Sequence, residues 1–452
     1  MAARSPVSLA YLLASVAVVG CVGVPAQEEK VARADLRAAG EKLRPPDGRS
    51  LLPELRADSP PEEFVRYAVF NNPAVAAAYF DWRASVEDIV QARSAPDPQF
   101  VFQADITNTL SSFMPGLMFD FMGSGKREAM GREAAMASGV ARRAYISAVY
   151  NTAAEVRKAW IELAYVEDAA RIREMSATAL GGSLAVADID YSTGRGMGTL
   201  ADHVRIENEL AKAQSELESL GDRRLSARLR FKSAMGLGPS DPDPVWPKAK
   251  LSPTAIPSPD ELWRRAIAAS PDLGRMRTMV EMAISGVEVA RRARQPDFTL
   301  GAMVDLRTNP TLFRPLATPD LPIWRDKVAA VVAAAEARRD ASLARVSAEQ
   351  LNLAAELAQA LYMVKEADRM IAFIDRDALP SYERAISTAE AASQSGVTNA
   401  AMIPEAEFMA LSMRLERLGA LRDRETAVTD LMLLTADIVP SDSPLPETPP
   451  HS

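Results

Sequence analysis

The sequence predicts a mainly α-helical protein with a small membrane β-barrel, in which long coiled-coil hairpins occur twice along the chain. Three observations support this fold class. A block of residues recurs about 200 positions later, proline is absent from 116 to 238 although the chain holds 31 prolines, and two stretches alternate apolar with polar residues. Because proline costs ~3 kcal/mol inside a helix, the proline-free stretch permits one very long helix.

The repeat aligns residues 61–100 with 259–298 without a gap, at an offset of 198 and with ten identities in forty positions. Its period far exceeds the ~20–50 residues of solenoid repeats, which indicates a duplicated domain. A proline-rich connector and a proline-rich tail follow the two copies, and we expect the tail to be disordered. The predicted division is 61–236 for the first copy, 237–258 for the connector, 259–435 for the second copy and 436–452 for the tail.

Both copies predict the same order of elements. A short helix (62–71; 260–269) and a second helix (74–94; 272–294) precede strands at 97–122 and 296–325, a long helix at 124–192 and 326–393, and a return helix at 199–236 and 400–435. Between Ile146 and Leu163 the apolar residues alternate spacings of three and four, as in a coiled-coil seam. At ~1.5 Å per residue the first long helix spans ~100 Å. Pro380 should kink the second.

The predicted strands carry a period of two. Phe100, Phe102 and Ala104 alternate with Gln99, Val101 and Gln103, and seven of the 13 phenylalanines lie in the two stretches. Apolar-out strands of ~10 residues are typical of outer-membrane barrels, although a hairpin on a soluble sheet would show the same pattern. Four strands cannot close a barrel, and open edges are not tolerated in lipid. A water-filled barrel would therefore need strands from three or more chains.

The N-terminus predicts export. Residues 1–20 combine the basic Arg4 with an apolar run, as a signal peptide does. The run ends in Val18-Val19-Gly20-Cys21, which resembles a bacterial lipobox, and Cys21 is the only cysteine of the chain. We expect lipidation of Cys21 followed by an anchor and linker at 21–60. The alternative is an ordinary signal peptide with an incidental cysteine.

Composition restricts the function further. A net charge of −8 and a pI of about 5.2 argue against nucleic-acid binding, which requires a concentrated basic surface. Gly123-Ser124-Gly125-Lys126 lacks the glycine and hydroxyl positions of a phosphate-binding loop, since Asp120 and Arg127 stand there. His203 and His451 are the only histidines, and no nucleophile–base pair is apparent. We therefore expect no catalytic residue, no metal site and no cofactor. The methionines from Met114 to Met136 could be soft copper ligands, but flexible packing is the expected role.

Several short motifs resemble the TolC family of outer-membrane efflux proteins from about residue 60 to 435. Asn72-Pro73 and Ser270-Pro271 match the helix-ending pairs of that family, and Gln91-Ala92-Arg93 matches its Q-A-R segment. The other matches are Gly123-Ser124-Gly125-Lys126-Arg127 for G-G-K-R, Leu321-Pro322-Ile323-Trp324 for L-P-L-F, and Tyr191-Ser192-Thr193-Gly194 for Y-x-x-G, with Ser393 replacing the tyrosine before Gly396 in the second copy.

The resemblance implies a homotrimer with a twelve-stranded β-barrel, four strands per protomer, and a trimeric α-barrel tunnel in the periplasm. It implies a passive exit duct, lipid-anchored in the outer membrane of a Gram-negative bacterium, for small molecules or metal ions handed over by a periplasmic adaptor protein and an inner-membrane pump. A type I secretion duct and a non-channel coiled-coil lipoprotein acting as a tether or adaptor remain alternatives. The cargo is not readable from the sequence.

The candidate site residues fall into three groups besides Cys21. The turns between long and return helices would dock the adaptor, charged residues beside them would gate the duct, and basic and aromatic residues would meet the lipid interface. The adaptor-docking residues are Gly194, Met197, Gly198, Thr199, Gly396, Val397 and Thr398; the gate candidates are Asp190, Arg195, Asp202, Arg205, Glu405 and Glu407; the lipid-interface residues are Lys126, Arg127 and Trp324.

Overall fold

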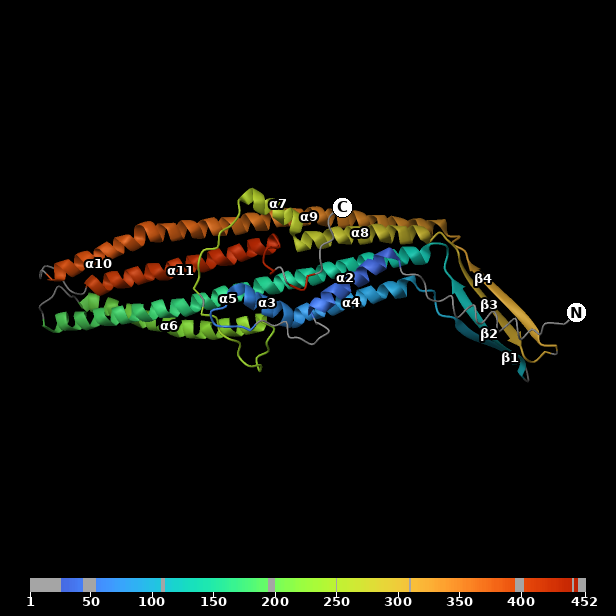
Figure 1. Ribbon diagram of the computed structural model, residues 1–452, viewed down its shortest axis with the longest axis horizontal. Helices are drawn as coiled ribbons and strands as arrows, with labels where there is room; N and C mark the ends of the chain where they lie inside the picture. Colours follow the sequence, from blue (N-terminus) through green and yellow to red (C-terminus); the bar gives the residue numbers. More distant parts are fainter. Residues whose placement is uncertain are drawn as a thin grey trace.

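The protein is a long helical rod that carries a four-stranded sheet at one end, as the computed structural model shows (Figure 1). The structure describes residues 26–43, 54–106, 110–193, 200–248, 250–308, 310–394, 402–440 and 443–445. The prediction of a mainly helical fold with a small antiparallel sheet is confirmed.

The first repeat contains α3 (Pro61–Asn71), α4 (Pro73–Arg93), β1 (Gln99–Ile106), β2 (Leu110–Phe121), α5 (Lys126–Thr193) and α6 (Leu200–Ala234). The second contains α7 (Pro259–Ala269), α8 (Pro271–Arg292), β3 (Asp297–Asp305), β4 (Leu312–Asp320), α9 (Arg325–Phe373), a π-helical turn η1 (Ile374–Ala378), α10 (Leu379–Gln394) and α11 (Met402–Leu434). With 68 residues, α5 is ~100 Å long at ~1.5 Å per residue.

The X-Pro pairs separate consecutive helices for a local reason. Asn72 follows α3, and its side-chain Oδ1 accepts a hydrogen bond of 2.9 Å from the Ala74 amide at the start of α4. Ser270 likewise accepts from the Leu273 amide at the start of α8. Each following proline occupies the first helical position, where a missing N–H costs nothing. The helices therefore restart at these pairs instead of continuing.

The second long helix is interrupted where Pro380 was expected to disturb it. The π-helical turn η1 ends at Ala378, two residues before Pro380. Proline has no N–H to donate and its ring crowds the carbonyl four residues earlier, so a wider turn relieves the helix there.

The core lies between the helices of the first repeat. Phe64 of α3, Trp82 of α4, Tyr145 of α5 and Phe231 of α6 are fully buried, and the Trp82 and Tyr145 rings stack with centroids 5.7 Å apart. A smaller cluster around Leu357 and Leu431 holds the second repeat together. In the space between the repeats, α5 packs on α8 and α11 as well as on its own α4 and α6.

Two regions differ from the sequence-based expectation. The linker expected at 21–60 contains a helix, α2 (Gln27–Leu43), which packs on α4 and α5. The prediction of a disordered tail is wrong for its described residues: Ile438 and Ser443 are buried, and the Tyr145 hydroxyl donates a hydrogen bond of 2.9 Å to the Pro444 carbonyl. Proline-rich composition predicted disorder, but Ile438, Val439 and Leu445 pack with the core of the first repeat.

Candidate functional site

The sheet joins the two repeats and has the order β1-β2-β3-β4, with all neighbours antiparallel. Because paired residues lie on the same face, the register decides which side chains share a face. One face is apolar from the helices to the bulge near Ile106, and Phe100 and Phe102 on it are 71% and 68% exposed. This apolar face consists of Phe100, Phe102, Ala104, Phe113, Pro115, Leu117, Phe119, Phe121, Phe298, Leu300, Ala302, Val304, Phe313, Pro315, Ala317 and Pro319.

The opposite face carries the polar side chains of the same strands, and they bind one another across the sheet. Asp120 accepts hydrogen bonds from Gln99 at 3.0 Å and from Thr299 at 2.5 Å. Ser112 donates to Asp305 at 3.1 Å. A sheet divided in this way suits an apolar medium on one side and water on the other.

The junction between the sheet and α5 is a folded contact. Asp297 at the start of β3 accepts a hydrogen bond of 2.7 Å from the Gly123 amide, and both its oxygens lie 2.8 Å from Lys126 Nζ. Gly125 has φ +75, a conformation that glycine adopts without strain. Lys126, expected to reach lipid, is held by Asp297, whereas Arg127 is exposed and Trp324 is 71% exposed. The contact of all three with lipid stays a prediction.

At the far end of the rod, the two helical hairpins approach each other. Arg205 of α6 and Glu405 of α11 form an ion pair of 3.1 Å, which brings two of the predicted gate residues together. His203, set aside as a catalytic group, lies 2.5 Å from Asp188 of α5. The Glu407 side chain is exposed on α11.

Other predicted residues lie outside the described part of the chain. These are Cys21, Gly194, Arg195, Met197, Gly198, Thr199, Gly396, Val397 and Thr398, together with the side chains of Asp190 and Asp202. Their roles stay predictions. Among the described residues, no group of three or more His, Cys, Asp or Glu side chains is arranged to hold a metal ion. In the same part of the chain, none of the helices combines the length and the apolar character needed to cross a membrane.

Comparison with known proteins yields a family match and a set of related folds. Residues 262–437, most of the second repeat, match the outer membrane efflux protein family. The fold is similar to that of a membrane protein from Pseudomonas aeruginosa, at 19% identity over 84% of this chain and 90% of that chain with a TM-score of 0.69. No curated protein sequence matches the chain.

Two further similar structures are named as outer-membrane proteins. The protein VceC from Vibrio cholerae is 16% identical over 83% of this chain and 95% of its own, with a TM-score of 0.66. The open state of the MtrE outer membrane channel of Neisseria gonorrhoeae is 16% identical over 85% of this chain and 90% of its own, with a TM-score of 0.68. At these identities the likeness concerns the fold, while the family match confirms the resemblance over residues 262–437.

Proposed function

We propose that this chain is the outer-membrane channel of a tripartite efflux system, because residues 262–437 match the outer membrane efflux protein family and the fold is similar to that of outer-membrane channels. Three copies would form a passive exit duct, with twelve strands in the membrane and a helical tunnel in the periplasm. An inner-membrane pump and a periplasmic adaptor would hand over small molecules or metal ions.

The sheet carries this proposal. Its strands of 8, 12, 9 and 9 residues reach ~26–40 Å at ~3.3 Å per residue, enough for the ~25 Å apolar band of an outer-membrane barrel. The apolar face would meet lipid and the polar face would line the lumen. Within one chain β1 and β4 are edges, and edges in lipid need partners. Pairing β4 of one copy with β1 of the next supplies them.

The helices support the same head-to-tail assembly. In one chain α5 is surrounded by its own α4 and α6 and by α8 and α11 of the second repeat. Its counterpart α9 packs on α7, α8 and α11, and leaves Leu343, Leu351, Tyr362 and Phe373 at least half exposed. If the repeats alternate around a closed ring, α4 and α6 of the next copy would cover this side of α9, as α8 and α11 cover α5.

A cysteine pair tests this arrangement. Lys158 of α5 pairs with Asp430 of α11 at 2.5 Å. Helix α6 ends at Ala234 and α11 ends at Leu434, so the two repeats correspond at an offset of about 200 residues. At this offset Lys158 of α5 corresponds to Ala358 of α9, and Asp430 of α11 corresponds to Arg230 of α6. We therefore expect Ala358 to lie opposite Arg230 of the next copy. Both positions are exposed. Chains carrying Ala358→Cys and Arg230→Cys should cross-link into dimers and trimers in membranes, whereas each single variant should not. Monomers alone, with both thiols accessible, would favour the tether interpretation.

We also propose that Cys21 carries a lipid anchor, because the only cysteine follows a lipobox-like run. One acyl chain binds membranes only marginally, so the anchor would act together with the barrel. Wild-type protein should incorporate a palmitate analogue, and Cys21→Ser should abolish incorporation. Wild-type protein that reaches the outer membrane without label would exclude the anchor.

The tips of the rod are the proposed docking and gating end. They lie ~100 Å from the sheet, where a partner in the inner membrane can reach them. The Arg205–Glu405 pair links the two hairpins of one chain, and three such pairs around an axis could hold the aperture closed. Exposed pairs contribute only ~0–1 kcal/mol each, so a docked adaptor could open the ring.

A further inference from the structure

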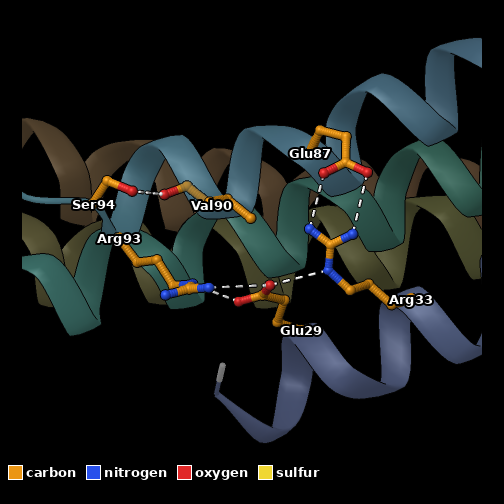
Figure 2. Close-up of polar contacts among 6 residues, drawn as sticks. All are labelled: Glu29, Arg33, Glu87, Val90, Arg93 and Ser94. Atoms are coloured by element: carbon orange, nitrogen blue, oxygen red, sulfur yellow. Dashed lines mark hydrogen bonds and ion pairs between the residues drawn. The ribbon is translucent and has the colours of Figure 1, made fainter. Parts of the chain in front are cut away.

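The helix α2 is clamped onto the rod by charged side chains that are partly withdrawn from water. Glu29 is 1% exposed and binds two arginines, Arg93 of α4 at 2.6 Å and Arg33 of its own helix at 3.1 Å (Figure 2). Arg33 in turn holds both oxygens of Glu87 on α4, at 3.1 and 2.9 Å. A buried carboxylate is costly without partners, so Glu29 stabilises only the docked position of α2.

The rest of α2 fits the same docked position. Leu36 and Ala39 are buried against α4 and α5, and Asp35 pairs with Arg142 of α5 at 3.2 Å. A Cβ atom on Gly40 would clash with the Tyr79 hydroxyl of α4, so glycine allows the close approach. At the end of α2, Lys42 donates to the Leu445 carbonyl of the tail at 3.1 Å.

These contacts fix the direction of α2. Residue 29 contacts residue 93 of α4, residue 33 contacts residue 87, and residue 40 contacts residue 79, so the two helices are antiparallel. The first turn of α2 therefore lies at the end of α4, on the side of the rod where the sheet begins (Figure 1).

The segment that follows α4 and the segment that precedes α2 have the same number of residues. Five residues, 94–98, separate Arg93 from the first residue of β1, and five residues, 22–26, separate Gln27 from Cys21. Five such residues bridge at most about 20 Å. A lipid on Cys21 would thus lie within about 20 Å of the start of α2, at the end of the rod that carries the sheet.

We infer that α2 is a rigid mount that sets where the N-terminal lipid anchor enters the membrane, with Glu29 as its positioning residue. The inference rests on the proposed lipidation for the identity of the anchor. The mount itself is built by protein contacts alone, so α2 should dock whether or not the lipid is present.

The second repeat shows that this arrangement is particular to the first. Arg291 is the repeat equivalent of Arg93, and it pairs with Glu336 of α9 at 3.2 Å. The described residues of the connector that precedes the second repeat, 237–248 and 250–258, contain no helix long enough to serve as a second α2. In the first repeat the equivalent arginine, Arg93, binds Glu29 of α2 instead.

Spin labels at Lys30→Cys and Ala77→Cys test the docking. They lie on the exposed sides of α2 and α4, ~20 Å apart along the helices. Labelled chains are diluted with unlabelled chains so that only distances within one chain are measured. The distance distribution between the two labels should be narrow in the full-length protein, and it should stay narrow when Cys21→Ser is added. Glu29→Ala should broaden it, and the matched neighbour Glu28→Ala, which is exposed, should not. Arg93→Glu combined with Glu29→Arg should restore the narrow distance.

A label at Ala26 tests the membrane position. In bilayers of outer-membrane composition with a lipid-bound nickel chelate, this label should relax fast in protein that carries Cys21→Ser, where only the docked α2 holds it near the bilayer, and slowly when Glu29→Ala is added. A broad wild-type distance, or a narrow one in Glu29→Ala, would overturn the mount. A narrow distance without contact to the lipid chelate would overturn its role at the membrane. If the protein incorporates no palmitate analogue but the distance between positions 30 and 77 is narrow, Cys21 carries no lipid anchor, and the docking of α2 still holds.

Discussion

At the residue scale, Glu29 is a buried carboxylate that is held by two arginines, Arg93 and Arg33. Burial alone would raise the pKa of this carboxyl, but hydrogen bonds from Arg93 and Arg33 outweigh burial and lower it below its ordinary value of 4.5. The pKa of Glu87 is lowered mainly by its hydrogen bonds with Arg33. Both carboxylates therefore favour docking of α2 while they are ionised.

The sign of the pH dependence follows from these lowered pKa values. The carboxylates of Glu29 and Glu87 bind protons more readily when α2 is released than when it is docked. Docking is therefore strongest above their ordinary pKa of 4.5 and weakens as the pH falls through their lowered pKa values. The distance between labels at positions 30 and 77 should stay narrow from pH 7 down to the ordinary pKa of 4.5 and broaden only below it. A distance that broadens between pH 8 and 6 instead would contradict this assignment.

At the scale of elements, the two faces of one strand should respond differently to charge. Phe102 and Gln103 are neighbours on β1, but Phe102 belongs to the apolar face and Gln103 to the polar one. A lysine facing lipid near the bilayer midplane costs ~2–4 kcal/mol, whereas one facing water costs little. Phe102→Lys should therefore lower the heat resistance of the membrane-embedded oligomer in gels, and Gln103→Lys should leave it near wild type. Equal losses in both variants would argue against a lipid-facing sheet.

How far the sequence predicts each element depends on the source of its stability. The X-Pro pairs and the alternating phenylalanines act locally, so the helices and strands next to them could be predicted. The helix α2 could not, because much of its stability comes from ion pairs such as Glu29–Arg93, whose partner is 64 residues away. The tail was misjudged for a similar reason, since Tyr145 holds Pro444 from 299 residues away. No local pattern contains such pairings.

At the tips, sequence identified the charged residues without their partners. Arg205 and Glu405 each stand beside a glycine-bearing turn, but only the folded hairpins show that these two form a pair. The polar face of the sheet was likewise visible as alternation, while the hydrogen bonds that Asp120 accepts from Gln99 and Thr299 required the register.

At the scale of the whole molecule, one chain is incomplete in two places. Within the described part of the chain, β1 and β4 are the unpaired edges of the sheet, and α9 leaves large apolar side chains exposed, Leu351 by 73%. In the proposed head-to-tail assembly, one neighbour would meet both deficits, since β4 and α9 belong to the second repeat and β1 and α6 to the first. A closed ring of identical copies satisfies every interface in the same way.

The central claim is that this ring conducts, and single-channel recording in planar bilayers tests it most directly. Purified wild-type oligomers should produce discrete conductance steps, because the polar face of the sheet would enclose water. Arg205→Ala should raise the size of the steps, since it removes the link between the hairpins at the tip. Glu28→Ala, far from the tip, should match the wild type. A stably folded monomer that inserts without any conductance would contradict the channel and leave a periplasmic tether as the better account.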